Sequence, residues 1–441
     1  MTDTDFISRD RIVADTAHNF FVEAGAGSGK TTMLVNRMVA MVENGIAVDK
    51  ICAITFTRAA AGEFYDRFQK KLSERAAVPG GMPARRPGAL PAATAVSCRR
   101  CAEALKNIDL CFLGTIDAFC NLVLREHPAR ARIPADAAVC PEAEMETFRR
   151  REYSRILRGE YGEKLQARGL RFCAFHRAPA KVFAGSIGRV QRARSARIFY
   201  EPAPSGTADT LFATEKTALA ELLHAVSACP GAVLATNSAT RAAQKTAMEK
   251  QTVLLGSWEQ DLPGVIEALE TLAGLRLGCE PAAIGITAEG LFRPVESRGK
   301  IKGWEIAPDS SAYPLKRLQE LRYAATMDFL CACAGPIAET LRGEGRLTFD
   351  DCLLYLRDVL REDAGRDGAL LRHIAARHSY FLIDEFQDTD PLQAEIFFYL
   401  TAQTPRTDWQ ACVPRPGSLF IVGDPKQSIY RFRDADVAAF L

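Results

Sequence analysis

One stretch of the sequence combines the residue types that bind phosphate groups. "AGAGSGKTT" (24–32) follows the apolar run "FFVEA" and opens an apolar-rich segment, for which we expect a helix from Lys30 to Asn44. Glycines let backbone N–H groups turn toward phosphate oxygens, and a helix N-terminus adds a partial positive charge. Lys30 is placed to reach the β- and γ-phosphates, and Thr31 to hold Mg²⁺. The alternative is a plain Gly-rich turn. The expected nucleotide-binding residues here are Ala26, Gly27, Ser28, Gly29, Lys30, Thr31 and Thr32.

A pair of adjacent acids could supply the rest of a hydrolytic site. "YFLIDEFQD" (380–388) is an apolar run that ends in Asp384 and Glu385. At the carboxyl edge of a parallel sheet these acids would lie beside the phosphate loop, because ligands bind at that edge. Asp384 can hold the metal through water, and Glu385 can accept a proton from the water that attacks the γ-phosphate. The alternative is a pair of solvated acids at a strand end.

A glutamine near the end of the chain could report on the same phosphate. The apolar run "SLFIVGD" (418–424) delivers Gln427 toward the same edge. A neutral amide there can form a hydrogen bond with the γ-phosphate or the attacking water and lose that bond on hydrolysis. Gln427 would then act as a sensor of the γ-phosphate. An ordinary surface loop is an equally strong interpretation of Gln427.

The helices and strands that must position these residues are typical of an α/β protein. Five short apolar runs predict strands, and helical segments of ten or more residues separate several of them, which is typical of a parallel sheet covered on both faces. These runs are "FFVEA", "ICAITF", "CFLGT", "YFLID" and "SLFIVGD". Between about Arg130 and Gly345 the strand signal largely disappears and Ala/Leu/Arg-rich helical segments dominate. We therefore expect a P-loop α/β domain (1–129 and 346–441) interrupted by a mainly helical inserted domain (130–345).

Composition limits the class of protein. A length of 441 residues suggests two to four domains, and a net charge of +2 means that any nucleic-acid surface must be a local patch. The N-terminus is acidic and polar, unlike a signal peptide, and no apolar run approaches the roughly 20 residues that span a bilayer. The 13 cysteines are scattered through apolar segments, which indicates reduced thiols. We expect a cytoplasmic protein without a membrane partner.

Together the motifs resemble the UvrD/Rep group of superfamily 1 DNA helicases, and within it the AddA/RecB branch. "VEAGAGSGKTT" resembles the Walker A form of this group, in which Ala commonly replaces the first Gly. Further matches occur in the expected order: "ITFTRAAAGEFYDRF" resembles motif Ia, "GTIDAFC" motif Ib, "LIDEFQDTDPLQ" motif II and "VGDPKQSIYRFRDADV" motif III, and "LTFDD" (347–351) resembles the segment before motif II. Asp117 stands where His is common, and Asp434 where Gly is usual.

The resemblance implies a RecA-like ATPase domain that binds ATP, Mg²⁺ and single-stranded DNA. It implies catalytic or nucleotide roles for Lys30, Thr31, Asp384, Glu385 and Gln427, and a role near the nucleotide for Arg37 in "LVNR". Aromatic faces stack bases at about 1–3 kcal/mol each and arginines hold phosphates. The implied DNA-binding positions are Phe56, Thr57, Arg58, Thr115, Asp117, Tyr430, Phe432 and Arg433. The alternative for Phe56 and Phe432 is a place in the core.

Two departures from the family pattern bear on function. Family members usually carry a glutamine before the P-loop that reads adenine, but no Gln precedes Gln69, and Phe6 or Arg9 lies in that neighbourhood, so the preference for ATP over GTP is open. The family also has a second RecA-like domain after motif III, whose arginines reach the γ-phosphate. We therefore expect this chain to be the N-terminal half of a motor, with weak turnover alone. The partner would be an AddB/RecC-like subunit or a separate second motor domain.

Other signals are weaker. Cys98 and Cys101, with Cys111 and Cys120, could hold zinc or an iron–sulfur cluster, although burial as small apolar residues suffices. A basic run in the middle of the chain could bind a phosphate backbone, although a solvated helix face is the stronger interpretation. It comprises Arg189, Arg192, Arg194 and Arg197.

Two other functions share some of these motifs. One is a non-motor, ATP-gated DNA-binding or regulatory protein, and the other is a P-loop kinase for a small molecule.

Overall fold

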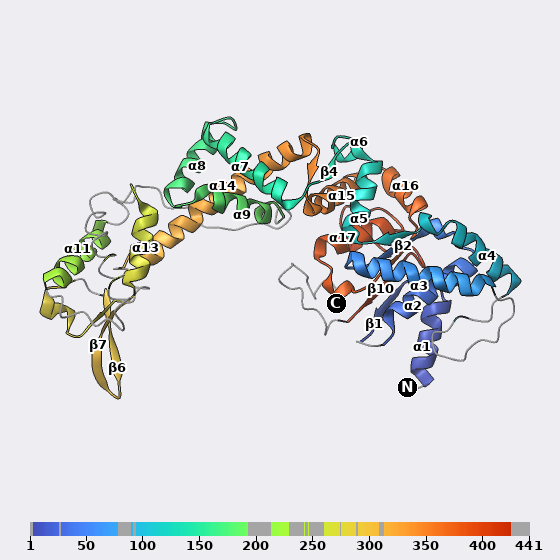
Figure 1. Cartoon of the computed structure of the whole chain (residues 1–441), viewed down its shortest axis with the longest axis horizontal. Helices are drawn as coiled ribbons and strands as arrows, with labels where there is room; N and C mark the ends of the chain where they lie inside the picture. The colour runs from blue at the N-terminus through green and yellow to red at the C-terminus, as the bar shows by residue number, and fades with distance from the viewer. Residues whose placement is uncertain are drawn as a thin grey trace. The chain divides into compact units, whose positions relative to one another are not determined.

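The computed structural model describes most of the chain, and the described part divides into two compact units. The described residues are 3–25, 28–77, 90, 94–192, 213–228, 242, 246, 260–273, 275–287, 290–307 and 313–424. Unit 1 comprises Met1–Val139 and Arg342–Leu441, and unit 2 comprises Cys140–Leu341 (Figure 1). No helix among the described residues is both long enough and apolar enough to cross a membrane.

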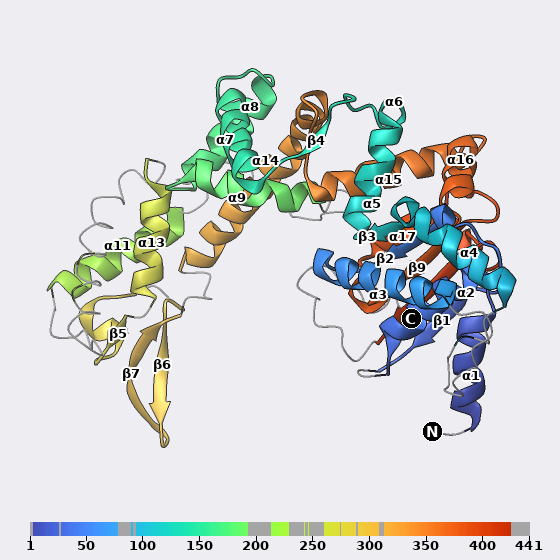
Figure 2. The same ribbon diagram turned by 45° about the vertical axis from the view of Figure 1, so that its right-hand side comes forward.

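Unit 1 is built on a five-stranded sheet with the order β1-β10-β9-β2-β3. Figure 2 labels β1, β2, β3 and β9 of this sheet. The strands are β1 (Phe20–Glu23), β2 (Ile51–Ile54), β3 (Phe112–Gly114), β9 (Tyr380–Ile383) and β10 (Leu419–Gly423). All four pairings are parallel, with Phe20 opposite Phe420, Leu419 opposite Phe381, Ile51 opposite Tyr380 and Cys52 opposite Phe112. The parallel α/β sheet predicted from sequence is confirmed, and the carboxyl ends of all five strands meet at one edge.

Helices cover both faces of this sheet because its strands are apolar on both sides. Ile51 and Ala53 of β2 are buried in one core, and Cys52 and Ile54 in the other, as the period-two alternation of a strand requires. The first core includes residues of α1 (Asp3–Ala14), α2 (Lys30–Glu43), α3 (Arg58–Ala77) and α4 (Ala95–Lys106). The second includes residues of α5 (Ile116–Glu126), α15 (Phe349–Ala364), α16 (Ala369–Arg377) and α17 (Pro391–Thr401).

Short elements complete unit 1 where the chain leaves for unit 2 and returns. Strand β4 (Ala138–Val139) pairs in parallel with β8 (Arg346–Leu347), and helix α6 (Pro128–Ala131) precedes β4. Ile133 and Ala137 are buried in the second core, which explains why unit 1 extends to Val139. The 3-10 helices of the unit are η1 (Val48–Lys50), η2 (Ile108–Leu110), η6 (Phe386–Asp388) and η7 (Trp409–Ala411).

Unit 2 is mainly helical, but it also contains a small antiparallel sheet that the sequence did not signal. The sheet has the order β5-β7-β6, from β5 (Arg276–Leu277), β6 (Phe292–Ser297) and β7 (Lys300–Ile306). Helix α14 (Leu315–Gly343) contributes residues to both cores of the unit, with Leu318 in one and Phe329 in the other. The remaining elements are α7 (Glu142–Leu157), α8 (Glu163–Ala174), α9 (Pro179–Arg192), α11 (Ala213–Ala228), α13 (Leu262–Leu272) and η5 (Pro281–Ile284).

Candidate functional site

The carboxyl edge of the five-stranded sheet gathers the chemistry-bearing residues that the sequence singled out. The backbone ladder continues one step beyond the strands, since the N–H groups of Ala24, Asp384 and Thr55 donate to the carbonyls of Gly423, Ile54 and Gly114 at 3.0, 3.0 and 2.9 Å. The phosphate loop follows β1, the acids follow β9, and motif Ia follows β2. Residues from distant parts of the chain therefore converge here.

The phosphate loop leads directly into helix α2. Gly29 is the N-cap residue with φ 82°, a left-handed conformation that glycine adopts at little cost, and Lys30 is the first helical residue. The Oγ of Ser28 is buried and has no hydrogen-bond partner among the described residues. Thr31 is half-buried and Thr32 is exposed, while Ala26 and Gly27 lie outside the described residues. A helix N-terminus beside an unsatisfied buried hydroxyl suits an anion that accepts hydrogen bonds.

Lys30 and Glu385 form the central contact of the site. The Lys30 Nζ lies 2.9 Å from the Glu385 Oε2, although 355 residues separate the two in sequence. Glu385 has φ 54° and ψ 42°, which is uncommon for a residue with a side chain. A left-handed non-glycine residue costs free energy, and such residues cluster at functional sites. The structure thus brings together the expected phosphate-binding lysine and the expected general base.

Two further carboxylates give this site an excess of negative charge. The backbone N–H of Glu385 donates to Asp384 Oδ1 at 3.0 Å. Burial, followed by the charge of Glu385, raises the pKa of Asp384 to about 6, and the same two causes raise the pKa of Asp388 to about 6. The Oδ1 of Asp388 is buried without a hydrogen-bond partner in the described part of the chain. Desolvated carboxylates of this kind favour a nearby cation.

Sequence reasoning missed one residue that contacts several members of the site. Gln387 is 3% exposed, its Nε2 donates to Glu385 Oε2 at 2.7 Å, and its Oε1 accepts from the backbone N–H of Asp424 at 2.8 Å. No spacing rule signals such a role, because the contacts depend on the turn after β9. Arg9 is also placed at the site, since its Nη1 donates to the Ser28 carbonyl at 3.1 Å.

Arg37, expected near the nucleotide, is packed in the interior of unit 1. It is 1% exposed, and its guanidinium donates to the carbonyls of Ile12, Asp15 and His18 at 2.6, 2.8 and 3.2 Å. The guanidinium carbon also lies 5.1 Å and 4.5 Å from the ring centroids of Phe20 and Phe420. Burial lowers the pKa of Arg37 to about 10. These contacts connect α1 and the turn after it to α2, and a nucleotide role for Arg37 stays a prediction.

The candidate DNA-binding residues in the described part of the chain follow β2 and β3, which are neighbours in the sheet. Phe56 is half-buried and lies beyond β2, while Thr57 and Arg58 are exposed at the start of α3. The Thr57 Oγ1 accepts from the Ala60 N–H at 3.1 Å, and the Thr115 Oγ1 caps α5 by accepting from the Ala118 N–H at 3.3 Å. Asp117 is half-buried. Gln427, Tyr430, Phe432 and Arg433 lie outside the described residues.

The cysteines noted in the sequence are buried in the packing of unit 1. Cys98, Cys101, Cys111 and Cys120 are all buried. Burial is the main cause that raises the pKa of Cys101 and Cys111 to about 12, so these thiols stay protonated near neutral pH. Among the described residues no group of three or more His, Cys, Asp or Glu side chains is arranged to hold a metal ion.

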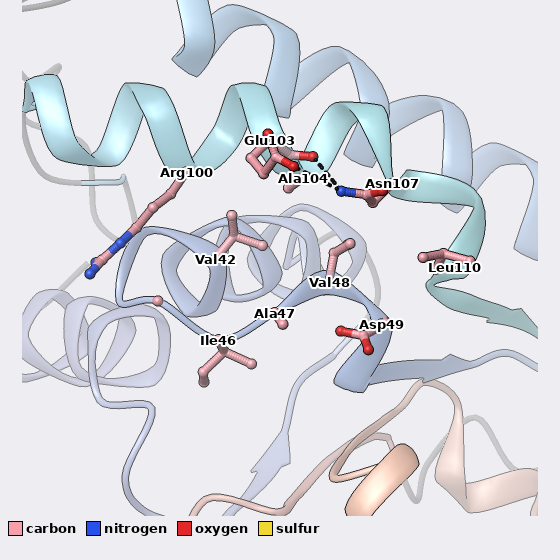
Figure 3. A pocket seen from close by; sticks show the side chains of 11 residues that line it. Val42, Ile46, Ala47, Val48, Asp49, Arg100, Glu103, Ala104, Asn107 and Leu110 are labelled. Carbon is pink, nitrogen blue, oxygen red and sulfur yellow. Dashed lines mark hydrogen bonds between the residues drawn. The ribbon is translucent and has the colours of Figure 1, made fainter.

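A separate cavity lies at the opposite, amino edge of the sheet. It has a volume of about 450 Å³ and is lined by α2, the turn before β2, α4 and η2 (Figure 3). Val42, Val48 and Leu110 contribute apolar surface. The Nδ2 of Asn107 donates to the carbonyl and the carboxylate of Glu103 at 3.2 and 3.3 Å, one helical turn away. Arg100, which also lines the cavity, donates through its Nη1 to the carbonyl of Glu43 at the end of α2.

Residues 7–441 match the family described as UvrD/REP helicase N-terminal domain. A protein from Syntrophomonas wolfei, described as one subunit of an ATP-dependent helicase/nuclease, is 25% identical over 468 residues, which cover 99% of this chain and 34% of that protein. The protein of the same description from Geobacillus thermodenitrificans is 26% identical over 482 residues, covering 98% and 36%. The chain therefore spans about a third of the length of these relatives.

Proposed function

Because the chain belongs to the UvrD/REP helicase N-terminal domain family, we propose that it is the ATP-binding motor domain of an ATP-dependent DNA helicase of recombination or repair. The observation that carries the proposal is the 2.9 Å contact between Lys30 and Glu385. It unites a phosphate-binding lysine with a carboxylate base at the edge where parallel α/β sheets bind ligands. In this proposal, unit 2 corresponds to the inserted domain that interrupts the RecA-like domain.

The residues at this edge fit ATP and Mg²⁺. The buried, unpartnered Oγ of Ser28 and the N-terminus of α2 suit phosphate oxygens, and Lys30 supplies a positive charge. Burial, followed by the charge of Glu385, raises the pKa of Asp384 and of Asp388 to about 6, so a bound cation would stabilise the ionised form of these carboxylates. Thr31 and Asp384 would hold the metal ion. When bound, Mg²⁺ supplies charge neutralisation at the phosphates.

The remaining chemistry belongs to side chains of the chain itself. Glu385 accepts a proton from the attacking water, as a general base does. The Lys30 ammonium has three N–H donors, and phosphate oxygens would compete with Glu385 for them and for its charge, so binding of the triphosphate would weaken the contact with Glu385 and free its carboxylate for this task. Gln427 would sense the γ-phosphate. Nucleotide binding and activation of the base are thereby linked through one lysine.

We assign single-stranded DNA to the ends of β2 and β3, beside the nucleotide site. Phe56 offers a partly exposed ring for base stacking and Arg58 an exposed charge for phosphate. Thr57, Thr115 and Asp117 border the same surface, and the proposal extends to Tyr430, Phe432 and Arg433. ATP hydrolysis next to these strand ends would then be coupled to translocation along DNA.

The relatives suggest the setting in which such a domain acts. Their descriptions name them as one part of an ATP-dependent helicase/nuclease. We infer that this chain works in the cytoplasm with an AddB/RecC-like subunit or with a second motor domain.

The test is a pair of measurements on the chain as it stands. We expect ATP with Mg²⁺ to bind, and an oligonucleotide of mixed sequence to change either its affinity or its turnover. DNA-stimulated turnover supports a motor. A change in affinity without turnover supports the first half of a motor or a non-motor, ATP-gated DNA-binding protein. Phosphorylation of a metabolite without DNA dependence, or ATP binding that DNA leaves unaltered, would contradict the proposal.

A further inference from the structure

Gln387 occupies the point at which the ladder between β9 and β10 is interrupted. Ile383 lies opposite Ile421, but the chain then turns through the left-handed Glu385, so the backbone of β9 leaves the sheet. Two residues later the side chain of Gln387 returns to that edge, where its Oε1 accepts from the Asp424 N–H at 2.8 Å. A side-chain amide thus replaces a backbone carbonyl at the end of β10.

The orientation of this amide follows from its partners. A backbone N–H can only donate and an ionised carboxylate can only accept, so the oxygen must face Asp424 and the nitrogen must face Glu385. The Nε2 donates to Glu385 Oε2 at 2.7 Å and has a longer contact of 3.4 Å with Asp388 Oδ2. With 3% exposure, Gln387 cannot rotate without leaving buried groups unsatisfied.

The contact matters most at Glu385. Its Oε2 receives hydrogen bonds from both Lys30 and Gln387, at 2.9 and 2.7 Å. Since Lys30 is also the expected ligand of the phosphates, Gln387 is the donor that can stay with the carboxylate when Lys30 turns to them. The other end of the amide holds Asp424, which is buried and whose Oδ2 approaches the phosphate loop at Gly25.

We propose that Gln387 is a positioning residue, which holds the Glu385 carboxylate and couples its position to the end of β10 at Asp424. This inference rests on the proposed ATPase function. In this arrangement a shift of Glu385 moves the amide, and the amide moves the end of β10. The nucleotide site and the end of β10 at Asp424 are therefore connected by two short hydrogen bonds through one side chain.

The test compares two variants with the wild-type chain. Gln387→Met preserves the approximate volume and removes both hydrogen bonds, whereas Gln387→Glu retains an acceptor for Asp424 and removes the donor to Glu385. In both variants we expect ATP affinity within about threefold of wild type and single-turnover hydrolysis slower by about 10- to 100-fold, the size of effect of one hydrogen bond to a charged group. Ile421→Val, a conservative change in the core of β10, is the control for a general loss of stability.

Hydrogen–deuterium exchange of the peptide 419–424 gives a readout that does not depend on turnover. Adding ATP with Mg²⁺ should alter exchange at Asp424 in the wild-type chain and leave it unaltered in Gln387→Met. Hydrolysis at the wild-type rate in both variants, or a persisting ATP response at Asp424 in Gln387→Met, would overturn the inference. So would a parallel loss of affinity and rate that Ile421→Val reproduces. Failure of the wild-type chain to bind ATP would instead overturn the proposed function.

Discussion

The two edges of the five-stranded sheet differ in how they use polar side chains. At the carboxyl edge, buried and half-buried polar groups are bonded to one another across strands: Lys30 follows β1, Glu385 and Gln387 follow β9, and Asp424 follows β10. At the amino edge, Asn107 bonds Glu103 within one helix, and Lys50 lies beside Asp49 on an exposed surface. Apolar residues such as Val48 line the cavity at this amino edge.

This difference follows from the direction of the strands. The loops that leave a parallel strand at its carboxyl end are free to carry side chains across the sheet, while the loops that enter at the amino end serve mainly to return the chain. Catalysis needs groups from separate elements within hydrogen-bond distance of one point. At the carboxyl edge a lysine, a carboxylate and a glutamine converge in this way, whereas Lys50 at the amino edge donates to a backbone carbonyl. Paired substitutions at the two edges should therefore differ in their effect on ATP binding and hydrolysis.

The largest effect should come from Glu385→Gln. Removal of the base should slow ATP hydrolysis by about 10²–10⁴-fold, the usual contribution of general base catalysis, while ATP affinity is retained. Single-turnover hydrolysis measures the rate of the chemical step, and equilibrium binding measures the ATP affinity. The matched substitution at the amino edge, Glu103→Gln, should alter neither quantity. A normal rate in Glu385→Gln would remove Glu385 from the role of base.

A second pair of substitutions compares lysines. Lys30→Ala should weaken ATP binding by about 10- to 150-fold, because it removes a hydrogen bond to a charged group. Isothermal titration calorimetry with ATP and Mg²⁺ measures this change in affinity. Lys50→Ala removes the lysine that directly precedes β2, whose Nζ donates to the Ala376 carbonyl at 2.7 Å, and should leave ATP affinity unchanged. Equal affinities in both variants would refute the phosphate-loop assignment.

A third pair concerns DNA. Phe56→Ala should weaken binding of single-stranded DNA by about 5- to 150-fold, the contribution of stacking one base, with little effect on ATP. Fluorescence anisotropy of a labelled oligonucleotide measures the change. Leu110 is 63% exposed at the amino edge, and Leu110→Ala should leave DNA affinity intact. If Phe56→Ala lowered only the melting temperature, Phe56 would be a core residue and the DNA surface would lie elsewhere.

The sequence predicted those parts of the molecule that depend on local patterns. Apolar runs of five to seven residues predicted all five strands of the sheet, and the Gly-rich stretch ending at Lys30 predicted the start of α2. Acids directly after an apolar run predicted Asp384 and Glu385 at the carboxyl edge. These signals suffice because strand length, helix starts and sheet edges are set by neighbouring residues.

Other features could not be predicted because they depend on contacts between distant residues. Gln387 meets Asp424 only once β9 and β10 are adjacent, and the turn at Glu385 fixes where its amide points. The small sheet of unit 2 was missed because β5 has two residues and β6 contains Pro294, which weakens a strand pattern. In each case tertiary packing, rather than the local sequence, determines the structure.

Arg37 provides the smallest expected effect on the site and separates support from chemistry. Arg37→Met keeps much of the side-chain volume but leaves the carbonyls of Ile12, Asp15 and His18 without their donor. The free energy of unfolding should fall by roughly 1–3 kcal/mol, the cost of unsatisfied buried acceptors. ATP affinity, measured well below the melting temperature, should change by less than about threefold, because the guanidinium is already committed to these carbonyls. A loss of affinity comparable to that of Lys30→Ala, without a loss of stability, would instead place Arg37 at the nucleotide. The two edges of the sheet would then differ less sharply, because a residue from the interior of unit 1 would also contribute to binding.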